Sequence, residues 1–278
     1  MLLAIDVGNT NMVLGVFDDD LLTESWRLVT MRERTSDEIG ILVTQLFERS
    51  DIELASIDGI ILSSVVPPLT GTMVEMCERF FEKSPLTVDP AGNTGMPVLY
   101  QPASDVGADR VVNGVAAYEA FGRESSIPVI VVDFGTATTF DAISSRGEYI
   151  GGVICPGIGI SADALFQRAA RLPRVDVRKP PAVVGQTTVT SMQSGLFFGY
   201  VAMVDGIVAR MRQELEDGDR AVCIATGGMA DVLASETQAI QRVEPDLTLR
   251  GLRIIWDRNR RELPIPNSQL PRTAHSAD

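Results

Sequence analysis

The sequence predicts an α/β protein built from two similar halves that face each other across a cleft. Two observations carry this prediction. Short apolar runs of strand length alternate with stretches of helical periodicity, which is typical of layered α/β folds. In addition, residues 5–11 (IDVGNTN) are matched by residues 132–138 (VDFGTAT), at an offset of 133 − 6 = 127 residues in a chain of 278.

Each half is expected to contain a β-hairpin. In both copies an apolar strand runs into Asp-x-Gly, a turn of small polar residues and a second strand. Ordinary hairpin chemistry could also place Asp-Gly and Asn-Thr in two unrelated turns. Strands are predicted at residues 2–5, 12–17, 59–62, 129–132, 139–143 and 221–225.

Helices are expected over residues 36–49 and 70–81. Ser36 ahead of Glu38 is typical of a helix start, and Pro67-Pro68 ends the preceding strand and opens the next helix. Residues 225–230 (ATGGMA) join a strand to a helix-like segment, and this pattern suits close backbone approach to a flat ligand such as adenosine.

The chain divides into two expected domains, residues 1–115 and 116–263. From Glu262 onward Pro, Asn, Ser and Arg replace the periodic apolar residues. Residues 264–278 are therefore predicted to form a flexible tail.

Composition excludes several classes of function. With 24 basic and 37 acidic residues the net charge is −13, which disfavours binding to nucleic acid or to anionic membranes. No apolar run reaches the roughly 18 residues of a membrane span, and no leader pattern opens the chain, so a cytoplasmic location is expected. Three scattered cysteines and one histidine indicate neither a zinc site nor a serine-histidine hydrolase.

The two hairpin turns have the chemistry of phosphate sites. Glycine turns expose backbone N–H groups, and Asn and Thr side chains add further donors. A P-loop lysine is missing, since only Lys83 and Lys179 occur in the chain, so the phosphates must be held by backbone, hydroxyls and metal ions. Asp6 and Asp133 end the first strands, where each could hold a hydrated Mg²⁺ ion or merely cap its turn.

Two hairpin phosphate turns together with a Gly-Gly motif resemble the superfamily of actin, heat-shock chaperone ATPases and sugar and acetate kinases. That superfamily duplicates a ribonuclease-H-like domain and binds nucleotide between the halves. Within it, residues 105–110 (DVGADR), 133–139 (DFGTATT) and 151–158 (GGVICPGI) resemble the type III pantothenate kinases. Residues 185–189 (GQTTV) also fit, although Gln-Thr stands where Lys-Asn is expected. The resemblance runs from residue 1 to about residue 257.

This resemblance implies transfer of the ATP γ-phosphoryl group to the primary hydroxyl of pantothenate. The product is 4′-phosphopantothenate, and the reaction is the first step towards coenzyme A. A primary alcohol is a poor nucleophile until a base takes its proton, and Asp109 matches the family's base. On the residues alone, a plain helix cap stays open as the alternative role for Asp109.

The resemblance also implies the binding residues. Those for ATP are Asp6, Val7, Gly8, Asn9, Thr10, Asn11, Met12, Val13 and Thr136. Those for pantothenate are Tyr100, Gly107, Ala108, Asp109, Arg110 and Thr188. Asp133 matches a site for a monovalent cation, K⁺ or NH₄⁺, and Asp6 is expected to hold Mg²⁺ through water. Plain structural roles stay open for several of them: a strand aromatic for Tyr100, a surface ion pair for Arg110, and turn hydroxyls for Thr136 and Thr188.

Homodimerisation is expected by analogy with the family, and neither nucleic acid nor membrane is an expected partner. Three other functions stay open: another small-molecule kinase of the superfamily, an actin-like or chaperone-like ATPase, and a transcription-regulating relative without kinase activity. The length of 278 residues leaves little room for the insertions of the ATPases. The intact Asp109-Arg110 pair and the acidic charge disfavour the regulator.

Overall fold

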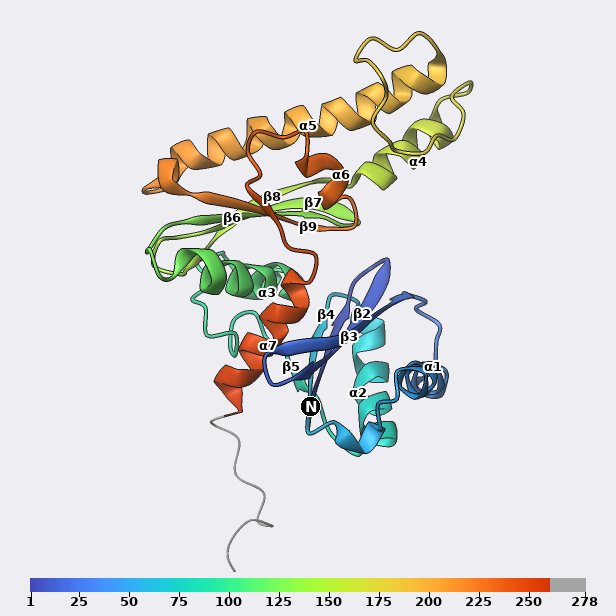
Figure 1. The fold of residues 1–278 in the computed structure, drawn as a ribbon, viewed down its shortest axis with the longest axis vertical. Coiled ribbons are helices and arrows are strands. Elements are labelled where there is room, and N and C mark those ends of the chain that lie inside the picture. The colour runs from blue at the N-terminus through green and yellow to red at the C-terminus, as the bar shows by residue number, and fades with distance from the viewer. Residues whose placement is uncertain (261–278) are drawn as a thin grey trace, which may run out of the picture.

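Two five-stranded sheets form the frame of the computed structural model, which describes residues 1–260 (Figure 1). The first has the order β3-β2-β1-β4-β5 and the second β10-β9-β6-β7-β8. In each sheet an antiparallel meander of three strands is extended by a parallel strand beside its first member. This shared topology confirms the predicted duplication. The strands are β1 (Leu2–Val7), β2 (Asn11–Asp18), β3 (Leu21–Val29), β4 (Gly59–Ser64), β5 (Leu86–Thr87), β6 (Val129–Phe134), β7 (Ala137–Ile143), β8 (Tyr149–Pro156), β9 (Val222–Gly227) and β10 (Arg242–Val243).

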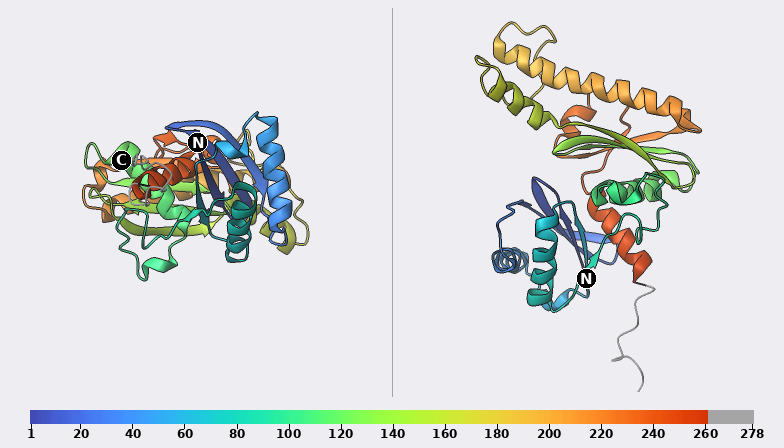
Figure 2. Two further views of the ribbon diagram at one scale, coloured as in Figure 1. Left: turned by 90° about the horizontal axis from the view of Figure 1, so that it is seen from below. Right: turned by 180° about the vertical axis from the view of Figure 1, so that it is seen from behind.

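Helices cover both sheets and separate them, so that the molecule has five layers (Figures 1 and 2). The outer face of the first sheet packs against α1 and α2, and that of the second against α5 and α6. The layer between the sheets consists of α3 and α7. The helices are α1 (Ser36–Arg49), α2 (Pro67–Phe81), α3 (Ala108–Ala117), α4 (Ile158–Arg168), α5 (Thr188–Glu214), α6 (Ala230–Ala234) and α7 (Leu247–Asn259).

Strand alternation decides which side chains face the middle of the molecule. In β1, Leu3 and Ile5 pack against the outer helices, whereas Leu2 and Ala4 belong to the central core around α3 and α7. Asp6 continues the inner row, beyond the end of that apolar core. Asp133 holds the same position at the end of β6.

The two predicted helices are confirmed: α1 has the predicted bounds, and α2 begins earlier than predicted. Thr35 is the N-cap of α1 and forms a capping box with Glu38, in which each side chain bonds the other residue's backbone N–H. The helix then begins at Ser36, as predicted. Pro67 and Pro68 occupy the first turn of α2, three residues before the predicted start, because proline is compatible with that turn.

The 27-residue helix α5 is the largest element that the sequence did not predict. By length and composition alone it could cross a membrane, and 44% of its most apolar 18-residue window is buried. Phe197, Val204 and Val208 are fully buried against the second sheet, as in the core helix of a globular domain.

The end of the described chain returns to the first half. Helix α7 packs on α3 and on β1 and β4 of the first sheet, although it follows the last strand of the second. The division at residue 115 therefore stays a prediction, and the tail predicted over residues 264–278 lies outside the described residues.

Candidate active site

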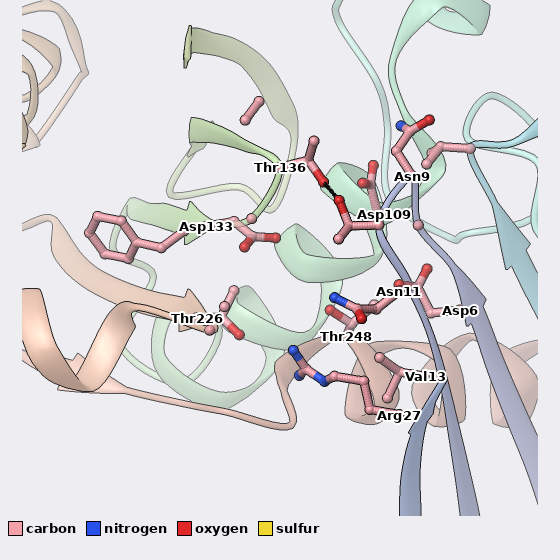
Figure 3. Close-up of a pocket in the computed structure, with 18 of the residues that line it drawn as sticks. Asp6, Asn9, Asn11, Val13, Arg27, Asp109, Asp133, Thr136, Thr226 and Thr248 are labelled. Carbon is pink, nitrogen blue, oxygen red and sulfur yellow. Dashed lines mark hydrogen bonds between the residues drawn. The ribbon is translucent and has the colours of Figure 1, made fainter. Parts of the chain in front are cut away.

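A cavity of about 640 Å³ lies between the two sheets, where the β1–β2 and β6–β7 turns approach each other (Figure 3). Both turns line it, as do the first turns of α3, α4 and α7 and the end of β9. The central apolar core fills the rest of the space between the sheets. The cavity is thus the polar end of the interface between the two halves.

The two turns are in direct contact. The hydroxyls of Thr10 and Thr136 lie 2.6 Å apart, which joins turns that are 126 residues apart in the sequence. The residue before α4 also lies against the β6–β7 turn, because a Cβ added to Gly157 would lie 2.1 Å from the carbonyl oxygen of Thr136. Only glycine allows this approach. Backbone groups from three elements therefore meet in a small volume, an arrangement that suits the oxygens of a polyphosphate.

Three of the five aspartates that line the cavity are Asp6 of β1, Asp109 of α3 and Asp133 of β6. The pKa of Asp6 and the pKa of Asp133 are both raised to about 7. Burial is the larger cause, and the negative charge of Asp109 is the second. Burial also raises the pKa of Asp109. These carboxylates therefore bind a proton more readily than isolated aspartates do.

Hydrogen bonds fix two of these carboxylates. Asp109 accepts the backbone N–H of Arg110 at 2.8 Å in the first turn of α3. Asp133 accepts the side-chain amide of Asn113 at 3.2 Å, and Asn113 in turn accepts the hydroxyl of Thr248 at 2.7 Å. This chain of bonds connects β6, α3 and α7 at the edge of the cavity.

Asp6 presents the opposite case. Its Oδ1 atom is buried and has no hydrogen-bond partner among the described residues. A buried carboxylate oxygen in this condition is costly unless a water or a cation completes it. A carboxylate oxygen is the kind of ligand that a hard cation such as Mg²⁺ prefers.

A buried ion pair lies next to Asp109. Nε of Arg110 donates to Oδ1 of Asp141 at 2.7 Å, and the hydroxyl of Tyr149 donates to the same oxygen at 2.6 Å. The guanidinium also lies 5.9 Å from the centre of the Tyr149 ring. Arg110 is therefore a buried and paired residue rather than the surface ion pair considered from the sequence.

Most of the predicted ATP residues line the cavity, namely Asp6, Gly8, Asn9, Thr10, Asn11, Val13 and Thr136. Val7 and Met12 do not, because their side chains point to the opposite face of the first sheet and are fully buried against α1 and α2.

The predicted pantothenate residues lie in three different places. Asp109 lines the cavity, and Gly107 and Ala108 lead into it at the start of α3. Tyr100 and Arg110 lie outside the cavity lining and belong to the region around Tyr149. Thr188 lies at the start of α5, on a separate groove of about 1080 Å³ between α4 and α5.

Several residues that the sequence did not single out also line the cavity: Arg27, Asp163, Asp246 and Thr248. Gly227 and Gly228, which the strand-glycine-helix pattern did indicate, join them. Gly227 has φ +92° and lies so close to Asp133 that a Cβ would come within 2.5 Å of its Oδ1. Arg27 could have been found only from the register of β2 and β3, because its neighbours in the sequence carry no motif.

Comparison with known proteins agrees with this geometry. The sequence model of the family described as type III pantothenate kinase matches residues 2–210. A type III pantothenate kinase of Myxococcus xanthus is 56% identical over 259 residues, which cover 93% of this chain and 99% of the relative. The type III pantothenate kinase of Geobacter sulfurreducens is 52% identical over 260 residues, or 94% of this chain and 100% of the relative.

Solved structures share the fold at low sequence identity. A Campylobacter jejuni protein assigned to the Baf family of transcriptional activators is 19% identical, with a TM-score of 0.58 over 93% of this chain and 99% of its own. A Sinorhizobium meliloti protein described as a 2-dehydro-3-deoxygalactonokinase is 12% identical, with a TM-score of 0.55 over 95% of this chain and 100% of its own. At these identities the likeness concerns the fold alone.

Proposed function

The chain belongs to the type III pantothenate kinases, and from that premise we propose how its cavity phosphorylates pantothenate. As a member of this family it transfers a phosphoryl group from ATP to pantothenate in the biosynthesis of coenzyme A. One observation carries the proposed mechanism: the Asp109 carboxylate faces the same cavity as the two turns joined by Thr10 and Thr136. A base and a phosphate site in one cavity are what in-line transfer to an alcohol requires.

Asp109 acts as the general base. Its raised pKa makes it a stronger base than an exposed aspartate, and the N–H of Arg110 holds its carboxylate in place. It accepts the proton of the primary hydroxyl of pantothenate while that oxygen forms its bond to the γ-phosphorus and the bond to the β-phosphate oxygen breaks.

The phosphates are held by the two turns. Residues 9–11 and 135–136 offer backbone N–H groups, and Asn9, Thr10 and Thr136 add side-chain donors. Adenosine lies towards Gly227-Gly228 and the start of α7, where backbone and small side chains leave space for a flat ring.

Asp6 and Asp133 would hold the cations that the reaction needs. Asp6, with its unpartnered Oδ1 atom, is the residue for Mg²⁺ bound through water, and Asp133 is the residue for K⁺ or NH₄⁺. When bound, these ions neutralise the charge that develops on the phosphates.

Arg110 and Tyr100 form the pantothenate side of the site, next to Asp109. Asp141 and Tyr149 keep the Arg110 side chain in one position. Tyr100 lies over the backbone of Gly151, where an added Cβ would meet its ring at 3.7 Å. Gly107 and Ala108 let the substrate approach the start of α3 closely.

Thr188 can meet pantothenate in this arrangement only if it comes from a second subunit, because within one chain it lies on a different groove from the cavity. We therefore propose a homodimer formed through α4 and the first half of α5. Leu165, Phe166 and Val189 of this region are between 39% and 43% exposed. Apolar residues gathered in this way are typical of interaction surfaces.

The decisive test of substrate is ADP release measured across pantothenate, acetate, glycerol and hexoses, with K⁺ present and absent. The proposal expects ADP release with pantothenate alone. Equal or higher rates with another alcohol would assign the chain to a different small-molecule kinase reaction. A chain that acts as an assembly ATPase would instead release ADP without any acceptor.

The role of Thr188 is tested by mixing variants. The test uses a heterodimer of an Asp109→Asn subunit and a Thr188→Val subunit. If each cavity takes Thr188 from the partner subunit, the cavity of the Thr188→Val subunit has both an intact Asp109 and an intact Thr188, and the other cavity has neither. About half of the wild-type activity per dimer is therefore expected. If both residues of a site come from one chain, each cavity carries one defect and activity does not recover.

A further inference from the structure

Arg27 lies in one row of side chains with Asp6 across the first sheet. Asp6 of β1 pairs with Val13 of β2, and Val13 pairs with Arg27 of β3. Residues directly opposite each other on neighbouring strands share a face, so all three side chains point towards the cavity. At about 5 Å per strand, Arg27 lies about 10 Å from Asp6 along this row. Figure 3 shows its guanidinium extending from β3 into the cavity.

The duplication of the fold is broken at this position. In the second sheet the matching row runs from Asp133 to Thr139 of β7 and on to Ile154 of β8. Where the first half presents Arg27, the second half presents an isoleucine that is 63% exposed. The strand pairing alone therefore does not require a charged residue here.

Arg27 is important because the side chains that line the cavity are otherwise acidic or neutral. Five aspartates line the cavity, and among the described residues Arg27 is the one basic residue that does so. None of the ion pairs within residues 1–260 includes it. Burial is the main cause that raises the pKa of Asp133, and the positive charge of Arg27 is one of the causes that lower it. A polyphosphate entering this cavity meets carboxylates and a single fixed cation.

The position of the Arg27 guanidinium determines which phosphates of a bound nucleotide it can contact. A Cβ on Gly228 would lie 3.9 Å from Nη1 of Arg27, so the guanidinium lies next to the place proposed above for adenosine. The phosphates that it can reach are therefore those nearest to adenosine in the nucleotide. The γ-phosphate must lie on the other side of the cavity, where Asp109 and the joined turns are. We propose that Arg27 binds the non-transferred phosphates of the nucleotide and takes the place of the lysine that a P-loop provides. This inference rests on the proposed function only for the identity of the nucleotide.

The experiment measures nucleotide binding in the absence of pantothenate, by titration calorimetry with Mg²⁺ present. The proteins are wild type, Arg27→Gln, Arg27→Lys and a matched control, Arg49→Gln, whose arginine is exposed at the end of α1 outside the cavity. The ligands are ADP, a non-hydrolysable ATP analogue and adenosine.

Loss of a charge-assisted bond to phosphate weakens binding about 10-fold to 100-fold. Arg27→Gln should show this loss equally for ADP and the ATP analogue, with adenosine binding changed less than twofold. Arg27→Lys should recover part of the loss, because it keeps the charge without the planar fork. In turnover the KM for ATP should rise more than kcat falls.

Three results would overturn the inference: ADP binding by Arg27→Gln within twofold of Arg49→Gln, an equal loss for adenosine, or a loss confined to the ATP analogue. Because these titrations contain no pantothenate, they remain informative if the wild-type protein fails to phosphorylate it. Turnover of pantothenate by wild type tests the proposed function separately.

Discussion

Replacing Asp141 by alanine should destabilise the protein strongly, because it leaves a buried charge without a partner. Asp141 is 0% exposed and Arg110 only 8%. The Asp141 Oδ1 atom accepts hydrogen bonds from Arg110 and Tyr149 at 2.7 and 2.6 Å. Breaking a buried pair from one side costs about 3 to 5 kcal/mol. The whole fold of a typical domain is stable by about 5 to 15 kcal/mol, so Asp141→Ala should remove a large part of it.

Urea unfolding followed by circular dichroism measures this cost. At an m-value of about 3 kcal/mol per M, the midpoint should fall by about 1 M or more, with m unchanged. The double variant Arg110→Met/Asp141→Leu supplies the control, since replacing both charges by apolar side chains is often close to neutral in stability. It should recover at least half of the loss while remaining poor in pantothenate binding. A midpoint for Asp141→Ala within 0.3 M of wild type, about 1 kcal/mol at that m-value, would refute the reasoning.

Three further predictions concern the cavity. Because the pKa of Asp133 is raised from 3.8 to about 7, its charge destabilises the folded cation-free protein as the pH rises through that range. Asp133→Asn should therefore raise the melting temperature relative to wild type much more at pH 8 than at pH 4, and an equal effect at both values would contradict this. Gly157→Ala places a Cβ 2.1 Å from the Thr136 carbonyl oxygen and should weaken ADP binding about tenfold or more. Gly71→Ala, where a Cβ meets nothing within 4 Å, is its control, and equal ADP affinities would count against the close approach. Replacing Na⁺ by K⁺ at constant ionic strength should raise the rate with Mg-ATP, and Asp133→Ala should largely abolish that stimulation; equal rates in the two salts would exclude a monovalent site.

The repeated hairpins could be predicted from the sequence because their signal is local. Strand alternation and the Asp-x-Gly turns at Asp6 and Asp133 are visible in one chain, and they place the phosphate turns at the ends of the strands. Helix α5 escaped prediction because Gly195, Gly199 and Gly206 interrupt its pattern, and packing on the second sheet stabilises it instead.

Residues that depend on long-range pairing could not be assigned. Arg27 enters the cavity through the register of β2 and β3, which contains an irregularity between Val16 and Phe17. Asp141 was missed because its partner Arg110 lies 31 residues earlier and the two meet only after α3 packs on the second sheet. Nothing in the sequence indicates that α7 returns to the first half.

The most direct test of the mechanism is the rate of pantothenate-dependent ADP formation by Asp109→Asn at saturating ATP and pantothenate. The substitution keeps the size of the side chain and an acceptor for the Arg110 N–H, but removes the base. The mechanism predicts a fall in kcat of about 10² to 10⁴, with ADP affinity and melting temperature close to those of wild type. A kcat within threefold of wild type would contradict the assignment of Asp109 as the general base.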